Sequence, residues 1–228
     1  MDDTNTQADD ITIHCLGLMA EAKSTLVRLD GIGTELLPTI VAYEGTTPIG
    51  YAMLHTPPAS PAALFRTIGH AAGLMVAGWH ATALAICLES YAETATPFDP
   101  PPEGTSLATR YATDPTIEEA LWVATATRLG NTSMGITIYH QTVGRIVNYD
   151  TPILSTPDQN EDFHTPGTIP NLLHQHLAHT ESKPAPEGST ITECRAAIAA
   201  RIHQLGYTVY LPDDPTWGKT QLHPDTTE

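Results

Sequence analysis

Apolar residues recur along this chain with two different periods, and the change of period separates predicted helices from predicted strands. From Asp10 the apolar positions follow a 3.6-residue period, so we expect an amphipathic helix that Asp10 caps and Gly31 stops. Its expected buried stripe has seven members: Ile11, Cys15, Leu18, Met19, Ala22, Leu26 and Leu29.

A second helix is predicted after Ser60, because Ser60 can cap it and Pro61 fits its first turn. Three glycines on this helix would let another element approach closely: Gly69, Gly73 and Gly78. Two further helices are expected, at 168–180 and at 191–205. The second of these begins with a capping box, Thr190 to Glu193, and ends at Gly206.

Strands are predicted where apolar residues alternate or where β-branched residues gather between turn signals. The expected strands are 39–43 and 49–55 as a hairpin, 80–93, then 117–128, 134–141 and 145–149 as a meander, and 207–211 as an edge strand. In the strand at 80–93, Leu84, Ile86 and Leu88 share one face, and small residues occupy the other. This pattern favours a central strand covered by a helix.

Adjacent strands joined by short turns, with helices set apart from them, predict an α+β fold. We expect a single domain at 10–211, with one mostly antiparallel sheet of about five to seven strands and helices packed on it. The acidic segment 1–9 and the polar segment 212–228 are predicted to be disordered tails. Two stretches rich in proline, 94–115 and 150–166, are predicted to be long loops.

The composition restricts the classes of function. With 26 acidic and 10 basic residues among 228, the formal net charge is −16, and such a chain repels phosphate. We therefore expect no direct nucleic-acid binding, and the acidity serves either solubility or docking to a basic partner surface. No apolar stretch reaches 18 residues and the N-terminus is polar, so neither a membrane span nor a secretory signal is predicted. The three cysteines lie apart among apolar residues, which is typical of a reducing cytoplasm.

One group of ionisable residues lies on, or at the ends of, strands that should be neighbours in the sheet: Glu89, Glu93, Glu118, Glu119, His140 and Arg145. Glu89 and His140 interrupt patterns that otherwise bury apolar residues, and a buried charge needs a partner. If helices cover both faces of the sheet, we expect Glu89 to be at least partly buried and paired with His140 or Arg145; the alternative is that these residues lie on a solvent-facing side of the sheet. These three are the candidate catalytic residues, although a structural ion pair is the favoured interpretation.

Other motifs give weaker evidence for a functional site. His176 and His179 share a face of a predicted helix and are candidate metal ligands, but a third ligand would have to come from elsewhere. In Glu21-Ala-Lys23 the two charged side chains point about 200° apart on a helix, which does not fit a nuclease triplet. No phosphate-binding glycine loop or serine-nucleophile motif occurs, so no cofactor is predicted.

Two segments, Ala83-Leu-Ala-Ile-Cys-Leu-Glu-Ser-Tyr91 and Asp114-Pro-Thr-Ile-Glu-Glu-Ala-Leu121 with the strand pair after it, carry a resemblance. The middle of the chain resembles small uncharacterised proteins of actinobacteria and their phages, over about a third of its length. In the pattern of that group the strand ends in Glu-Ala-Trp, where this chain has Glu89, Ser90 and Tyr91. The resemblance implies no activity, cofactor or site residue.

Taken together, these features predict a non-enzymatic, cytoplasmic, phage-associated protein that binds another protein through its sheet edge or loops. In a virus the location would be the host cytoplasm. Two alternatives remain open: a hydrolase or metal-dependent enzyme that uses a Glu/His pocket, and an acidic nucleic-acid mimic that inhibits a host enzyme. The oligomeric state is left open.

Overall fold

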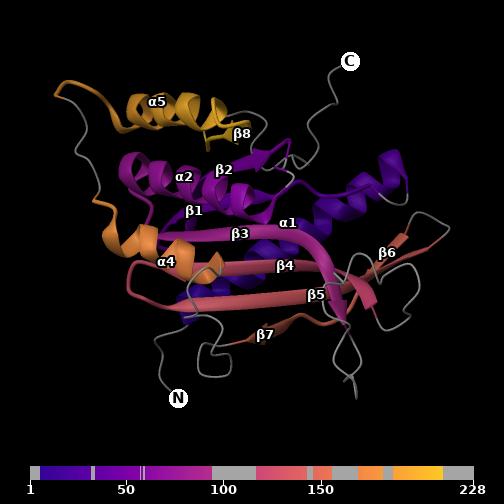
Figure 1. The fold of residues 1–228 in the computed structure, drawn as a ribbon. Coiled ribbons are helices and arrows are strands. Elements are labelled where there is room, and N and C mark those ends of the chain that lie inside the picture. The colour runs from indigo at the N-terminus through magenta and orange to yellow at the C-terminus, as the bar shows by residue number, and fades with distance from the viewer. Residues whose placement is uncertain are drawn as a thin grey trace.

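The computed structural model describes residues 6–31, 34–56, 58, 60–93, 117–142, 146–155, 169–181 and 187–212. Its helices are α1 (Thr6–Asp30), α2 (Pro61–Trp79), α4 (Ile169–His179) and α5 (Ile191–His203) (Figure 1). Its strands are β1 (Thr39–Glu44), β2 (Thr47–Leu54), β3 (Ala83–Glu93), β4 (Ile117–Thr127), β5 (Thr132–Thr142), β6 (Ile146–Tyr149), β7 (Ile153–Ser155) and β8 (Tyr207–Tyr210).

All eight strands belong to one sheet with the order β6-β5-β4-β3-β1-β2-β8, and β7 also pairs with β5. Every strand pair is antiparallel. The α+β prediction is confirmed, and β3 is a central strand as its two apolar faces indicated. The sheet has one strand more than expected because β7 forms inside the predicted loop at 150–166.

β6 and β7 both pair with the outer edge of β5, and a bulge separates them. Tyr139 pairs with Tyr149, whereas Ile136 pairs with Ile153. Two residues of β5 therefore lie opposite three residues of the other chain segment, which is the definition of a β-bulge. As a result, the outer edge of β5 is occupied along most of its length.

The sheet lies between two helical layers (Figure 1). On one side α1 runs across β3, β4, β5 and β6. On the other side α2 and α4 pack on the sheet, and α5 packs on α2 and β8. Alternation along β3 divides its side chains between the layers: Ala83, Ala85 and Cys87 face α1, and Leu84 and Ile86 face α2.

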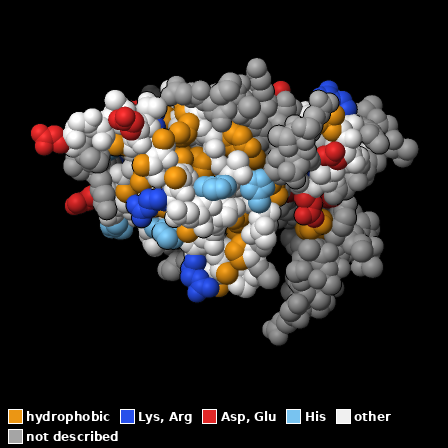
Figure 2. All heavy atoms as spheres, turned by 90° about the horizontal axis from the view of Figure 1, so that it is seen from above, with side chains coloured by type: hydrophobic (Ala, Val, Ile, Leu, Met, Phe, Trp, Pro, Cys, Tyr) orange, Lys and Arg blue, Asp and Glu red, His pale blue; other side chains and the backbone are white. Residues whose placement is uncertain are grey.

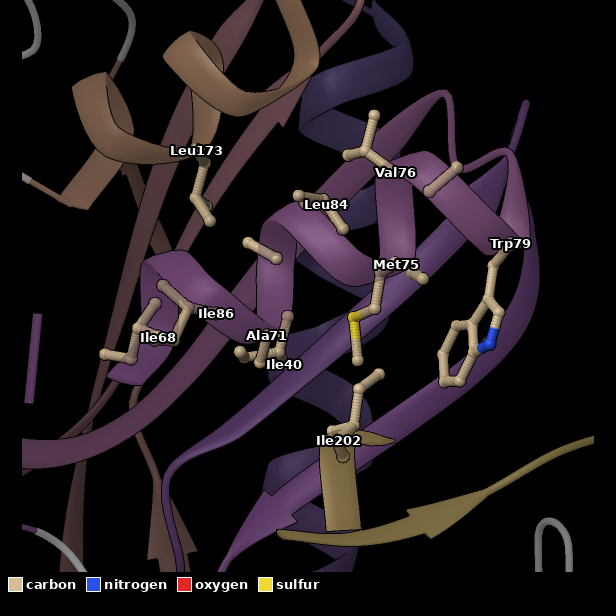
Figure 3. Close-up of a cluster of buried hydrophobic side chains, with 14 of the residues drawn as sticks. Ile40, Ile68, Ala71, Met75, Val76, Trp79, Leu84, Ile86, Leu173 and Ile202 are labelled. Carbon is tan, nitrogen blue, oxygen red and sulfur yellow. The ribbon is translucent and has the colours of Figure 1, made fainter. Parts of the chain in front are cut away.

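The larger of the two cores lies beneath α2 (Figure 3). Met75 and Trp79 of α2 contact the β-sheet side chains there, and Leu173 of α4 and Ile202 of α5 complete the cluster. Trp79 is fully buried, and its indole N–H donates a hydrogen bond to the carbonyl of Arg195 at 3.0 Å. Because the indole nitrogen has this partner, the whole ring can be buried at little cost.

Local signals in the sequence account for most of the helix boundaries. The hydroxyl of Ser60 accepts a hydrogen bond from the backbone N–H of Ala63 at 3.3 Å, and Thr190 with Glu193 forms the predicted capping box. The predicted close approaches at glycines also occur. A Cβ on Gly69 would lie 3.0 Å from His176 of α4, and one on Gly78 would overlap Ile198 of α5.

Two predictions about α1 need correction. α1 begins at Thr6, so residues 6–9 are helical and not part of a disordered tail, because the small side chain of Ala8 packs fully into the core. Leu18 and Leu29 are exposed, since they lie on the solvent flank of the α1 stripe. Residues 1–5 and 213–228 lie outside the described residues, as do the predicted loop at 94–115 and most of the one at 150–166.

Candidate functional site

Glu89 lies on β3, the central strand, and its side chain points toward α1. Only 11% of this side chain is exposed. It follows Ala83, Ala85 and Cys87 on the face that α1 covers, so the alternation of the strand places a carboxylate at the margin of an apolar layer. The expectation that Glu89 is at least partly buried is confirmed.

The partner of Glu89 is Lys23 of α1. The Lys23 Nζ lies 2.6 Å from Glu89 Oε1, and 1% of the lysine side chain is exposed. Lys23 also donates to the backbone carbonyl of Thr34, in the connection between α1 and β1. One ammonium group therefore joins a helix, a strand and a connecting segment.

The remaining polar atoms of the pair have partners too. Glu89 Oε1 also accepts a hydrogen bond from the hydroxyl of Tyr139 on β5, and Oε2 accepts one from the backbone N–H of Leu36 at 2.6 Å. The Lys23 ammonium lies 5.0 Å from the centroid of the Tyr139 ring, within the range of a cation–π contact. We call Lys23, Glu89 and Tyr139 the charged cluster.

Tyr149 of β6 extends the charged cluster along α1. Its hydroxyl donates to the carbonyl of Ala20 at 2.7 Å and lies 3.0 Å from the hydroxyl of Ser24. Burial raises the pKa of Tyr149, and the negative charge of Glu89 raises it further. The hydrogen bond with Ser24 lowers it, but the net shift is upward. The phenol therefore stays protonated at neutral pH and acts as a hydrogen-bond donor.

The chemistry open to the charged cluster is limited by how completely it is paired. Lys23 Nζ is engaged by the Glu89 carboxylate and the Thr34 carbonyl, and only 1% of the lysine side chain is exposed, so a substrate atom has little access to it. Removing one partner of such a pair leaves an uncompensated buried charge, which is strongly destabilising. The charged cluster therefore holds α1, β3, β5 and residues 34–36 together.

His140 and Glu118 lie on the opposite side of the sheet from Glu89. Successive side chains of a strand point to opposite faces, so His140 points away from the face that holds Tyr139. Its ring nitrogens lie 3.8 Å from a carboxylate oxygen of Glu118 and 3.9 Å from one of Asp150. The prediction that His140 pairs with Glu89 is therefore wrong.

The other members of the predicted group are also separated. Glu119 accepts a hydrogen bond from Gln141 at 2.7 Å on the α1 side of the sheet. Arg145 and the side chain of Glu93 lie outside the described residues. The structure thus divides the predicted polar pocket between the two faces of the sheet.

The candidate metal ligands do not come together either. The His176 ring packs against Gly69 and Gly73 of α2, and burial, together with the charge of His70, lowers its pKa. His179 is exposed at the end of α4. Across the described ranges, no three His, Cys, Asp or Glu side chains are grouped in a way that could hold a metal ion.

Cys15 and Cys87 are buried between α1 and the sheet, as expected for small hydrophobic residues. The two thiols share a hydrogen bond, and Cys15 Sγ lies 3.1 Å from the hydroxyl of Tyr43. The hydrogen bond to Cys15 and burial raise the pKa of the Cys87 thiol, and burial raises that of Tyr43. The raised pKa keeps the Cys87 thiol protonated and weakly nucleophilic.

A second feature, which the sequence interpretation missed, is a row of apolar side chains on the side of the sheet that faces α2 and α4. The registers align Leu88 with Trp122, Trp122 with Ile136, and Ile136 with Ile153. None of the four is buried, and Ile153 is 63% exposed. We call these four residues the apolar ladder. Its signal in the sequence is the run Met134, Ile136, Ile138, in which three successive positions of one face are apolar.

Among the described helices, none combines the length and hydrophobicity needed to cross a membrane. Comparison of the chain with family models, with curated proteins and with solved structures found no match.

Proposed function

We propose that this protein acts in the cytoplasm by binding another protein, without catalysing a reaction. The resemblance of its middle segment to small proteins of actinobacteria and their phages supports a phage-associated role, in the host cytoplasm if the chain is viral. The observation that carries the proposal is the apolar ladder. Monomeric proteins rarely expose contiguous apolar surface without a use for it, and such surface typically marks an interaction site.

The charged cluster also supports a role without catalysis. It contains the residue types that catalysis would need, yet each of its polar atoms is engaged with another atom of the chain. A catalytic carboxylate or amine needs a free position where a substrate atom can approach. The cluster therefore fits stabilisation of the fold better than turnover of a substrate.

The two alternatives are less well supported. An enzyme using Glu89 and His140 would need them on one face of the sheet, and they lie on opposite faces. A nucleic-acid mimic would need a regular array of acidic side chains. On the face shown in Figure 2, the described Asp and Glu side chains are scattered in small separate groups and form no continuous row, and several hydrophobic side chains lie between them.

Site-specific photo-cross-linking tests the proposed function. A photoreactive residue is placed at Ile153 and, as a matched control, at Ile13, which is 50% exposed on α1 at the other side of the sheet. In a lysate of the organism that carries the gene, we expect Ile153 to yield one discrete adduct that Ile13 does not. The adduct should disappear when Ile136→Glu is added to the same chain. Identical adducts from both positions, or none from either, would contradict the proposal.

A further inference from the structure

The apolar ladder lies beside α4, which among the described helices is the last one of the layer on that side of the sheet. α2 packs against β1, and α4 packs against β3, β4 and β5 (Figure 1). Beyond α4, the side chains of Met134, Ile136 and Ile138 on β5 remain partly exposed. The next member of this layer would therefore lie across β5 and β7.

A helix fits this position better than an added strand does. A strand can join a sheet only at an edge, and one added outside β6 or β7 would extend the sheet in its own plane and leave the side chains of the ladder uncovered. A helix, in contrast, packs face-on and buries an apolar stripe against the side chains of several strands. Ile136 and Ile153 present such a surface, and it continues into Leu88 and Trp122, which already pack against the core beneath α2 and α4.

Charge at one end of the exposed face of β5, beside the ladder, selects the kind of helix. Beyond Ile138 on the same face of β5 comes His140, which lies between the carboxylates of Glu118 and Asp150. Both carboxylates are partly solvent-exposed, and the chain as a whole carries a net charge of −16. A basic partner is attracted to this end, and an acidic one is repelled.

We infer that the apolar ladder is the docking site for an amphipathic helix of a partner protein, with lysine or arginine residues at the end that meets Glu118 and Asp150. The helix continues the layer formed by α2 and α4 and covers Ile136 and Ile153. This inference rests on the proposed function, for which it names the surface and the class of partner.

The test uses the full chain and two synthetic helical peptides with the same leucine stripe, one with lysine and one with glutamate on the polar face. Binding is followed by anisotropy of a dye on the peptide. We expect saturable binding of the lysine peptide that is at least about tenfold tighter than that of the glutamate peptide. Ile136→Ser should weaken it about tenfold or more, because truncated side chains at the centre of an interface have the largest effects.

Two further variants locate the peptide. Glu118→Lys combined with Asp150→Lys should reverse the preference between the two peptides. Ile13→Ser on α1 is the matched control and should leave both affinities unchanged. Equal binding of the two peptides, or equal loss in Ile13→Ser and Ile136→Ser, would overturn the inference.

Other occupants of the ladder give different outcomes. If a second copy of this chain covers it, light scattering will show a dimer that Ile153→Glu converts to a monomer. If the chain itself buries it, Ile136→Ser will lower the melting temperature of the free protein as much as Leu121→Ala, a change in the core. Either result would overturn the helix inference.

The failure of this inference and that of the proposed function can be told apart. If neither peptide binds while the Ile153 cross-link to a native partner persists, the protein binds a partner of another kind and only the helix inference fails. If the cross-link is also absent, the proposed function fails with it.

Discussion

The two faces of β5 are the reverse of what hydropathy predicts. The face toward α1 carries Ser133, Gly135, Thr137 and Tyr139, and all four are buried. The opposite face carries Met134, Ile136 and Ile138, and all three are partly exposed. On this strand, the polar and small residues lie inside and the aliphatic residues face outward.

The difference shows that shape and hydrogen bonding decide which face α1 covers. A Cβ on Gly135 would lie 2.6 Å from Thr12 Cγ2 and 2.8 Å from Leu16 Cδ1, so glycine allows α1 to approach the strand. The Tyr139 hydroxyl donates a hydrogen bond to Glu89 Oε1, and the Thr137 hydroxyl donates one to the carbonyl of Asp150. On this buried face the Tyr139 and Thr137 hydroxyls have hydrogen-bond partners, whereas the Ser133 hydroxyl has none among the described residues, so close packing contributes as well as hydrogen bonding. An apolar face left outside can serve another protein.

The largest effect is expected at the buried ion pair on the α1 side. Lys23→Met leaves the Glu89 carboxylate without its cation, which should cost about 3–5 kcal/mol in the free energy of unfolding by urea. Adding Glu89→Met should recover much of this loss, because an apolar pair of similar volume tolerates the same position. Glu21→Gln, at an exposed position of the same helix, is the control. If Lys23→Met unfolds at the same urea concentration as the parent, the charged cluster has no structural role.

Close packing on the buried face of β5 can be tested at Gly135. Gly135→Ala places a methyl group against Thr12 and Leu16, and such overpacking should cost about 1–3 kcal/mol. Gly17→Ala is the control, because a Cβ there meets nothing within 4 Å and should stabilise α1 by about 0.5–1 kcal/mol. Thermal unfolding measures both. Equal melting temperatures for Gly135→Ala and the parent would show that α1 is less closely packed than described.

Acid should weaken the packing of α4, the helix beside the apolar ladder. Burial and the charge of His70 lower the pKa of His176 below 6.5, so the unfolded chain takes up a proton at a higher pH than the native protein does. The stability that neutral His176 contributes is complete above pH 6.5 and is lost as the pH falls below it. The urea midpoint should therefore fall less steeply with acid in His176→Gln than in the parent. The exposed His179→Gln is the control, and parallel pH profiles for all three proteins would contradict the prediction.

The smallest effect is expected on the exposed face. Ile136→Thr keeps a β-branched side chain in the strand and loses only partly buried apolar area, so it should cost less than about 1 kcal/mol. Leu121→Ala, in the core beneath α1, should cost about 2–5 kcal/mol by comparison. Denaturant midpoints measured side by side provide the ranking. A cost for Ile136→Thr that approaches that of Leu121→Ala would remove the contrast between the two faces.

Much of the charged cluster could have been read from the pattern of α1. Lys23 lies four residues after Met19 and eight after Cys15, so it falls on the buried stripe of the helix. A lysine on such a stripe needs an acidic partner, and Glu89 is an acid in an otherwise apolar strand pattern. The two residues are 66 positions apart, and only the way α1 crosses the sheet makes them neighbours.

The wrong partner for Glu89 has an equally simple cause. His140 and Tyr139 are adjacent in the sequence, yet the strand period sends their side chains to opposite faces. The registers of β3 with β4 and of β4 with β5 decide whether Tyr139 or His140 shares a face of the sheet with Glu89. A shift of one residue in either register would place His140, in place of Tyr139, on the face of Glu89.

The sequence by itself determined the helices, most of the strands and the α+β class, because caps, turns and hydrophobic periods act between residues a few positions apart. Only the tertiary structure decided that Lys23 is the partner of Glu89, that β7 adds to β5 after a bulge, and that α1 covers the polar face of β5. These features depend on contacts between residues far apart in the chain. The energies of such contacts arise only when whole elements pack, so no local pattern encodes them.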